Sequence, residues 1–351
     1  MSKSFKHQRD FVAIQVKRRS RFKSCTPRTL IFLPGLLLAA AVSVAEPRVQ
    51  TFVYKRVGSL EIKADVYQPT VGRTLRPVVV YIHGGSLINL GRDGIRQNPL
   101  KDLFLSDGFV VVSIDYRLAP ETKLPGIIED IEDAFRWVRE KGPALFAADG
   151  ERIGATGASA GGYLTLMTGI RVHPRPCVLL AEMSYCDPVG PWQANPSPHR
   201  PHYETHLSRD EAWRQVSGLP IANGADRKGD GNAFNDFVRR NAEWPKAVSG
   251  WDPKTEIEKF LPYRPVHHVT PTYPPTFLMH GEADTDVPFE QPQRMAAELA
   301  RHGVEHRLVG IPGGEHGYRG GDKGILEAGR REAAAFVRKH LTGTACTPSR
   351  K

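Results

Sequence analysis

Hydrophobic residues are arranged in two different patterns along this chain of 351 residues. Runs in which almost every residue is apolar predict strands that are buried on both faces. Stretches in which apolar residues recur every three or four positions predict helices with one buried face. In chain order, the predicted strands cover residues 77–85, 109–117, 152–159, 177–183, 275–281 and 306–314. The predicted helices cover residues 99–108, 125–142, 160–170, 289–303 and 324–341. Because strands and helices alternate, we predict an α/β fold with a doubly wound, mostly parallel sheet.

Two segments depart from this alternation. Residues 52–58 and 60–69 alternate polar and apolar positions on either side of a turn, which predicts a β-hairpin. Residues 187–275 carry little strand signal and much Pro, His, Trp and Asn, with helical spacing only at 207–218 and 233–248. An insertion of this length between two core strands is rarely a plain loop. We therefore predict a lid or substrate-binding subdomain at 187–275.

The glycine-rich stretch ATGASAGGYL, residues 155–164, has more than one possible interpretation. A dinucleotide-binding turn needs a glycine where Tyr163 stands, because the backbone must approach the cofactor closely there. No Tyr-x-x-x-Lys pattern follows, since Met167 stands four residues after Tyr163, and the stretch lacks the Gly-Lys-Ser/Thr of a phosphate-binding loop. Two interpretations remain for Ser159: a nucleophile elbow of the form G-x-S-x-G, or a helix cap.

The sequence HGGS begins at His83 and follows the apolar run VVVYI. Consecutive glycines allow backbone N–H groups to turn toward a reacting carbonyl and to stabilise its oxyanion, and losing one such donor costs about 10²–10³ in rate. We expect Gly85 and Ser86 to be the main donors, with Gly84 as the alternative. Ala160 would complete the oxyanion hole from the elbow. His83 is expected to shape the loop rather than to move protons.

A histidine and a group of carboxylates lie farther along the chain. The sequence GGEHGY places His316 in a glycine-rich loop after the last predicted strand, from which an imidazole can reach a serine. The sequence HGEADTDVP follows the strand before it and offers Glu282, Asp284 and Asp286 as the acid that orients the histidine. The chain order of serine, acid and histidine is the order of α/β-hydrolases.

Five motifs in this order resemble a known family. HGGS, DYRLAP, GASAGG, HGEADTDVP and GEHGY are similar to the motifs of α/β-hydrolase esterases related to hormone-sensitive lipase, and of the neighbouring acetyl-xylan and feruloyl esterase-like group. The resemblance covers roughly residues 53–341. It implies the α/β-hydrolase fold, with Ser159 as nucleophile and His316 as base.

The resemblance also bears on the acid and on the oxyanion hole. It assigns the acid to Asp284, because Val287 and Pro288 then fall in register with the family pattern H-G-x-x-D-x-x-V-P, and Asp286 is the fallback. Ser86 stands where the family carries a further glycine, which leaves the choice of oxyanion donors open.

These features together predict an enzyme that cleaves carboxylic esters. We expect small acyl esters, or acetylated carbohydrate and phenolic esters, to be hydrolysed through an acyl-enzyme without a metal or an organic cofactor. Two alternatives stay open. One is an amide hydrolase of the serine peptidase or formamidase type on the same scaffold. The other is a hydrolase-like binding protein without catalysis.

Other candidate sites lie in the insertion. His199, His202 and His206 have metal-like spacing, but solvated histidines are the more common outcome in a proline-rich segment, and we predict no metal. The sequence DRKGDGN, residues 226–232, is interpreted as a turn rather than a calcium loop, because Lys228 stands where a ligand is needed. Four tryptophans could either line a substrate cleft or form the core of the insertion. They are Trp192, Trp213, Trp244 and Trp251.

Charge is concentrated at the N-terminus. Residues 1–45 contain nine Lys or Arg residues and one acid, and so account for eight of the ten net positive charges. The rest of the chain is nearly neutral, which argues against a nucleic-acid partner.

The uncharged stretch 30–45 is short for a membrane span and ends in Ser-Val-Ala. This pattern predicts an export signal at 1–45, although a retained membrane anchor is the alternative. We therefore expect an exported protein, periplasmic or secreted, with a hydrolase domain at 46–341 and a flexible tail at 342–351.

The number and spacing of the four cysteines predict neither a disulfide framework nor a zinc site. Cys177 and Cys186 flank a predicted strand, and an extended strand would hold their Cα atoms about 25–30 Å apart. A disulfide requires less than about 7 Å, so we expect these two not to pair.

Overall fold

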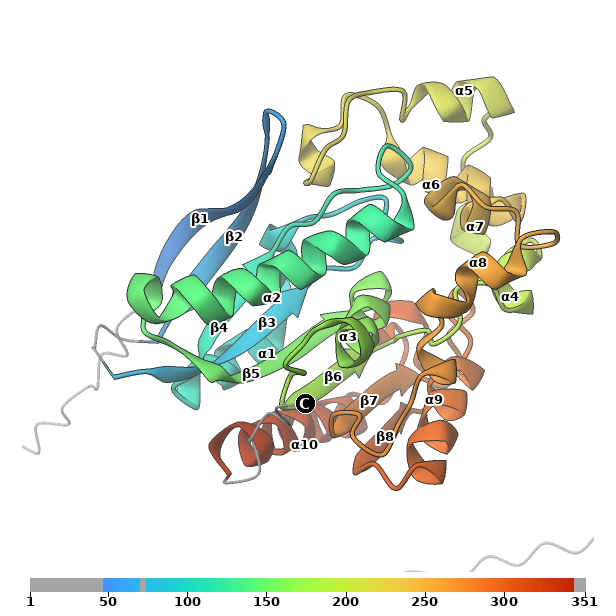
Figure 1. Cartoon of the computed structure of the whole chain (residues 1–351). Coiled ribbons are helices and arrows are strands. Elements are labelled where there is room, and N and C mark those ends of the chain that lie inside the picture. The colour runs from blue at the N-terminus through green and yellow to red at the C-terminus, as the bar shows by residue number, and fades with distance from the viewer. Residues whose placement is uncertain (1–46, 70–73, 344–351) are drawn as a thin grey trace, which may run out of the picture. The chain divides into compact units, whose positions relative to one another are not determined.

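An eight-stranded sheet forms the centre of the computed structural model, which describes residues 47–69 and 74–343. The strand order is β1-β2-β4-β3-β5-β6-β7-β8 (Figure 1). The strands are β1 (Arg48–Val57), β2 (Leu60–Gln68), β3 (Arg76–Ile82), β4 (Val110–Ile114), β5 (Ala148–Ala158), β6 (Val178–Glu182), β7 (Thr276–Gly281) and β8 (His306–Ile311). Only the β1–β2 and β2–β4 pairings are antiparallel, and the other pairings are parallel. The predicted hairpin and the mostly parallel sheet are thus both present.

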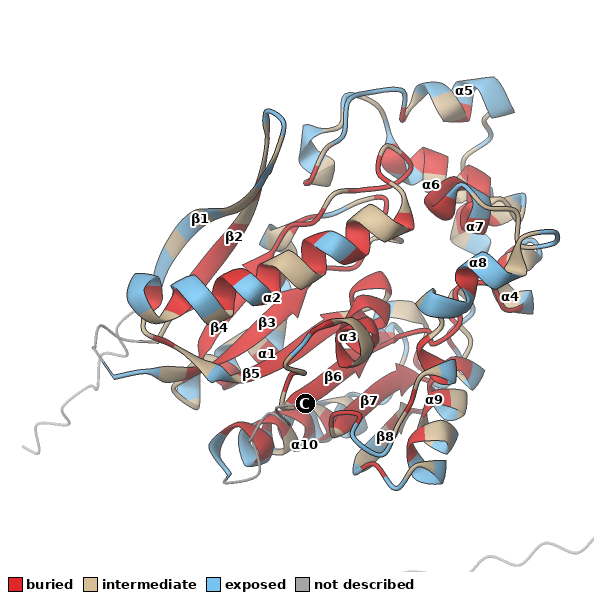
Figure 2. Cartoon of the chain, viewed as in Figure 1, coloured by how far each residue is buried: buried red, intermediate tan, exposed pale blue. Residues whose placement is uncertain are grey.

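Helices cover both faces of the sheet. The covering helices are α1 (Pro99–Ser106), α2 (Leu124–Phe146), α3 (Ala160–Arg171), α9 (Glu290–Arg301) and α10 (Lys323–Thr342). Apolar residues of α2, α3 and α9 belong to one hydrophobic core, whereas those of α1 and α10 belong to a second core. The central strands are buried between these layers (Figure 2), which is why their sequences are nearly continuous apolar runs.

The insertion, residues 187–275, contains short helices and no strand. Its helices are α4 (Pro191–Ala194), α5 (Arg209–Arg214), α6 (Gly231–Arg240), α7 (Trp244–Ser249) and α8 (Ile257–Phe260). Figure 1 shows these helices, coloured from yellow-green to orange, on the side of the sheet toward which the parallel strands point. In an open α/β sheet this edge carries the ligand site.

Two helices differ from the sequence prediction. The stretch 233–248 forms two helices rather than one, because Ala242 adopts a left-handed φ of 57° between them. Conversely, α2 continues past the predicted end at Gly142 and through Pro143 to Phe146. Phe146 is only 2% exposed, so its packing in the core offsets the loss of one helical hydrogen bond at the proline.

Several expectations concern the ends of the chain. The export signal at 1–45 and nearly all of the tail at 342–351 lie outside the described residues, so both stay predictions. Within residues 47–69 and 74–343, none of the helices has the length and apolar character that a membrane crossing requires. Cys186 is a free, buried thiol, so it does not pair with Cys177.

Candidate active site

Ser159 occupies a sharp turn between β5 and α3. Its φ of 57° and ψ of −122° are strained for a residue with a side chain. Such strain in a non-glycine residue is typical of functional turns. Although Ser159 precedes the first residue of α3, its side chain makes no capping hydrogen bond. The helix-cap interpretation therefore fails, and the half-buried hydroxyl is left available at the carboxyl edge of the sheet.

Glycines make this turn sterically possible. A Cβ atom added to Gly161 would lie 2.0 Å from the carbonyl oxygen of Ile82, and one added to Gly157 would lie 2.5 Å from the carbonyl oxygen of Gly161. Both distances are far inside van der Waals contact, and the atoms involved belong to the backbone. The G-x-S-x-G spacing is thus required by close backbone packing, as the elbow interpretation predicts.

The HGGS loop lies directly beside the serine. A Cβ atom built on Gly84 would be 3.4 Å from the Cβ of Ser159 and 2.8 Å from the carbonyl oxygen of Ala158. Gly85 and Ser86 both have positive φ values, 91° and 58°. In the described part of the chain, the N–H groups of Gly84, Gly85 and Ser86 donate to no acceptor. Unpaired N–H groups beside a serine are what an oxyanion hole requires.

The contacts of His83 are with this loop and with Tyr116. Its ring is stacked on that of Tyr116, with 4.1 Å between centroids, and its Nδ1 lies 2.9 Å from the carbonyl oxygen of Gly84. The Tyr116 hydroxyl donates to the carbonyl oxygen of His83 at 2.9 Å. Burial lowers the pKa of His83 to about 4, so its ring is neutral at physiological pH. The structural role expected from the sequence fits these contacts.

His316 and Asp284 form a hydrogen-bonded pair at the same edge of the sheet. Nδ1 of His316 lies 2.7 Å from Oδ2 of Asp284. The other oxygen, Oδ1, accepts hydrogen bonds from the backbone N–H groups of Asp286 and Val287 at 2.9 and 2.8 Å. Burial alone would raise the pKa of Asp284, but hydrogen bonds from His280 and His316 outweigh it and lower that pKa to about 2. The carboxylate is thus ionised, and it orients the imidazole.

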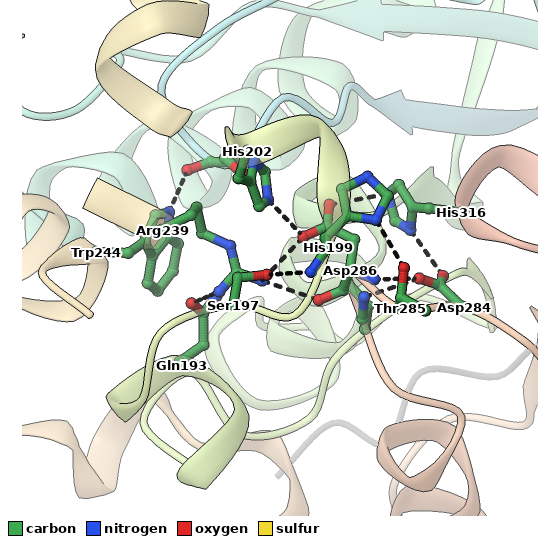
Figure 3. Close-up of polar contacts among 12 residues, drawn as sticks. Gln193, Ser197, His199, His202, Arg239, Trp244, Asp284, Thr285, Asp286 and His316 are labelled. Carbon is green, nitrogen blue, oxygen red and sulfur yellow. Dashed lines mark hydrogen bonds and ion pairs between the residues drawn. The ribbon is translucent and has the colours of Figure 1, made fainter. Parts of the chain in front are cut away.

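The other two carboxylates of the acid loop have different surroundings. Glu282 is exposed at the surface. Asp286 turns toward the insertion, where its Oδ1 contacts Arg239 and His202 at 2.9 and 3.0 Å (Figure 3). Its Oδ2 lies 4.0 Å from Nε2 of His316. Asp284 is thus paired with Nδ1 of His316, whereas Asp286, the alternative candidate for the acid, faces Nε2 on the opposite side of the ring.

The end of β6 connects the serine turn with the histidine loop. The N–H group of Ser159 donates to the carbonyl oxygen of Glu182 at 2.9 Å, and the hydroxyl of Tyr318 donates to the carboxylate of Glu182 at 3.1 Å. The N–H group of Gly317 lies 3.0 Å from the sulfur of Met183. In the described part of the chain the hydroxyl of Ser159 has no hydrogen-bond partner, so no hydrogen bond joins it to His316. Glu182 is not predicted from the sequence, although a charged residue at the end of an apolar run is a visible signal.

The rings of His199 and His202 lie edge to face, with 5.1 Å between their centroids, but the two side chains have different hydrogen-bond partners. Nδ1 of His199 lies 2.8 Å from the hydroxyl oxygen of Thr285, whereas His202 lies between Asp236 and Asp286, and His206 is exposed. Within residues 47–69 and 74–343, no group of three His, Cys, Asp or Glu side chains is arranged to hold a metal ion. His202 and Arg239 contact the acid loop, and no pattern in the sequence predicts this contact.

The tryptophans of the insertion have mixed roles. Trp213 and Trp251 pack on phenylalanines of the same insertion, which favours the core interpretation. Trp192 lies under the guanidinium of Arg239, with 5.2 Å from the guanidinium carbon to the ring centroid. Trp244 is different, because its Nε1 donates to the carbonyl oxygen of Ser86 at 3.1 Å. The insertion thus contacts the HGGS loop through Trp244.

Family models match the two parts of the chain that hold the site. The family described as BD-FAE matches residues 64–177, which include Ser159 and the HGGS loop. The prolyl oligopeptidase family matches residues 232–344, which include Asp284 and His316.

Curated and solved relatives add to these matches. A non-reducing polyketide synthase of Penicillium brevicompactum is 31% identical over 328 residues, which are 80% of this chain but 15% of that protein. A protein of unknown function from Staphylococcus aureus has a TM-score of 0.64 at 19% identity, covering 84% of this chain and 99% of its own. The esterase of Pyrobaculum calidifontis has a TM-score of 0.57 at 26% identity, covering 85% of this chain and 86% of its own.

Proposed function

We propose that this chain, an α/β-hydrolase of the carboxylesterase type, hydrolyses esters through an acyl-enzyme on Ser159. It is similar to the esterases related to hormone-sensitive lipase. The observation that carries the proposal is the hydrogen bond of 2.7 Å between His316 and Asp284. It lies at the same edge of the sheet as the strained Ser159 turn and the unpaired N–H groups of the HGGS loop. These are the parts that serine hydrolysis requires.

The first half-reaction acylates the serine. His316 accepts the hydroxyl proton at Nε2 as Ser159 Oγ attacks the ester carbonyl, and the resulting imidazolium is stabilised by Asp284. The carbonyl oxygen becomes an oxyanion, for which the N–H groups of Gly85, Ser86 and Ala160 are the proposed donors. Gly84 remains the alternative, because its N–H group is equally unpaired. His316 then gives the proton to the leaving alcohol.

The second half-reaction releases the acid. Water loses a proton to His316 as it attacks the acyl carbonyl, and the tetrahedral intermediate expels Ser159, which takes the proton back. No step requires a metal ion or an organic cofactor.

The proposed substrates are small acyl esters, including acetylated carbohydrate and phenolic esters. The insertion is the proposed lid over this site, since it lies at the carboxyl edge of the sheet and contacts the HGGS loop through Trp244. The match to the prolyl oligopeptidase family favours amide hydrolysis as a second candidate.

A substrate panel distinguishes ester from amide hydrolysis. We expect the acetyl and butyryl esters of 4-nitrophenol to be hydrolysed with kcat/KM at least about 10³-fold above that of the matching 4-nitroanilides. Acetylated xylan and feruloyl esters would then rank natural leaving groups. Faster cleavage of the anilides would favour the amidase over the esterase. If neither the esters nor the anilides were hydrolysed, both proposals would be contradicted.

The pH dependence of the reaction is expected to follow His316. Burial alone lowers the pKa of this histidine, but its hydrogen bond to Asp284 and the charge of Asp286 outweigh burial and raise the pKa above its ordinary value of about 6.5. The base acts only when neutral, so kcat/KM should fall as the pH drops through that raised pKa. Initial rates with 4-nitrophenyl acetate from pH 5 to 9 would measure this, and a rate that stays constant well below pH 6 would contradict it.

A further inference from the structure

Asp286 directs one carboxylate oxygen toward the histidine. Its Oδ2 lies 4.0 Å from Nε2 of His316, which is the nitrogen that exchanges protons with the serine and with water. This separation is too long for a direct hydrogen bond. In the part of the chain that the structure describes, Oδ2 accepts no hydrogen bond, whereas Oδ1 accepts from two side chains.

The insertion fixes the direction in which Oδ2 points. Nη2 of Arg239 donates to Oδ1 of Asp286 at 2.9 Å and to its backbone carbonyl oxygen at 2.9 Å. Nε2 of His202 donates to the same Oδ1 at 3.0 Å. Figure 3 shows Asp286 between Arg239 on one side and His316 on the other. Because Arg239 is only 2% exposed, this arrangement is held by buried contacts.

The charges around Asp286 balance. His202 lies between two carboxylates, 2.9 Å from Asp236 and 3.0 Å from Asp286, so both ring nitrogens must donate and the ring is an imidazolium. With Arg239, two cations thus face two anions. Burial alone would raise the pKa of Asp286, but the hydrogen bond from His202 and the charge of Arg239 hold it well below its usual range. Asp286 is therefore a hydrogen-bond acceptor at working pH.

The distance between Asp286 and His316 matches that between two groups bridged by one water molecule. Two acceptors 4.0 Å apart can share a water that makes a hydrogen bond of about 2.8 Å to each, with an angle near 90° at the water oxygen. A water held in this way donates one hydrogen to each side. Its lone pairs are then directed elsewhere, which is the orientation an attacking nucleophile needs.

We propose that Asp286 is the positioning residue for the water that hydrolyses the acyl-enzyme. This inference rests on the proposed acyl-enzyme at Ser159. The water oxygen bonds to the acyl carbon while one of its protons passes to Nε2 of His316. The second hydrogen stays on the oxygen and is hydrogen-bonded to Oδ2 of Asp286. The bond from the acyl carbon to Ser159 Oγ then breaks, Oγ takes the proton from His316, and the carboxylic acid leaves with the second hydrogen.

A consequence is discrimination between water and alcohols. Methanol has a single O–H group, which must face His316 in order to be deprotonated. It has no second hydrogen for Oδ2 of Asp286. The carboxylate should therefore favour transfer of the acyl group to water over transfer to methanol.

The substitution Asp286→Asn tests this with little change of shape. Arg239 and His202 are both donors, so they select the amide oxygen at the Oδ1 position, and the NH2 group takes the place of Oδ2. An acceptor thus becomes a donor at the atom that faces His316. With 4-nitrophenyl acetate and a fixed methanol concentration, we expect the ratio of methyl acetate to acetate to rise about tenfold, the size of one lost charge-assisted hydrogen bond. The ratio is read at the high-pH plateau, where His316 is neutral in every variant.

Two further variants complete the experiment. Asp236→Asn makes the same chemical change on the far side of His202 without altering the atoms that face His316, and its product ratio should equal that of the wild type. Asp286→Glu keeps the charge that Arg239 and His202 require but displaces the oxygen that faces His316, so the ratio of methyl acetate to acetate should also rise. This variant replaces Asp286→Asn in the test if circular dichroism shows that Asp286→Asn does not fold. Equal ratios in the wild type and both Asp286 variants would overturn the proposal. If the wild type released neither acetate nor methyl acetate, the proposed ester hydrolysis itself would be contradicted, independently of the role of Asp286.

Discussion

Replacement of Ser159 by alanine should lower kcat for 4-nitrophenyl acetate by about 10⁴–10⁶-fold and leave the protein folded. The hydroxyl makes no capping hydrogen bond, so its removal costs the structure little. The nucleophile is lost completely, and only binding and the oxyanion hole can still assist the attack of water. Steady-state rates, with thermal unfolding as the measure of folding, would determine both effects.

Ser184 provides a matched control for this substitution. Its side chain is buried just after the end of β6, and its hydroxyl, like that of Ser159, has no hydrogen-bond partner in the described chain. Ser184→Ala should therefore retain activity within a few-fold of the wild type. If Ser159→Ala were as active as Ser184→Ala, the binding-protein alternative or a different nucleophile would have to replace the proposed mechanism.

The second large effect is expected from Asp284→Asn. An asparagine retains the shape of the side chain but cannot stabilise the histidine cation, and its amide favours the wrong tautomer of His316. We expect kcat to fall by about 10⁴-fold, as is typical when the acid of such a triad becomes an amide. The measurement is kcat at several pH values, with the folded state checked by circular dichroism.

Glu282→Gln is the control for the acid, because this exposed residue lies in the same loop and loses the same charge. It should behave as the wild type. A fall of 10²-fold or less for Asp284→Asn, together with a larger fall for Asp286→Asn, would show that Asp286 carries out the role assigned to Asp284.

Much of the architecture could be predicted because burial leaves a direct signal in the sequence. Strands β3, β4 and β6 are buried along nearly their whole length, so their apolar runs were readable without a structure. The Ser159 turn was predictable for a second reason. Gly157 and Gly161 approach other backbone atoms so closely that no Cβ is possible, and that constraint appears as a motif.

Other features depend on contacts that no local pattern encodes. Arg239 and His202 contact Asp286 across 47 and 84 residues of chain, so the acid loop gave no hint of its partners. The register of Val287 and Pro288 indicated Asp284 as the acid but did not show that Asp286 faces the opposite edge of His316. The break between α6 and α7 at Ala242 depends on a left-handed φ that alanine rarely adopts. For the acid loop, tertiary contacts rather than local sequence thus determine which side chains meet.

Covalent trapping of Ser159 is the most direct measurement of the central claim, that this serine carries the acyl group. The wild-type protein would be incubated with an aryl organophosphate, and its intact mass and peptide masses would be determined. We expect a single adduct per chain on the peptide that contains Ser159, loss of esterase activity in proportion to labelling, and no adduct in Ser159→Ala. Full labelling at another residue, or esterase activity that persists after Ser159 is fully labelled, would contradict the proposed mechanism.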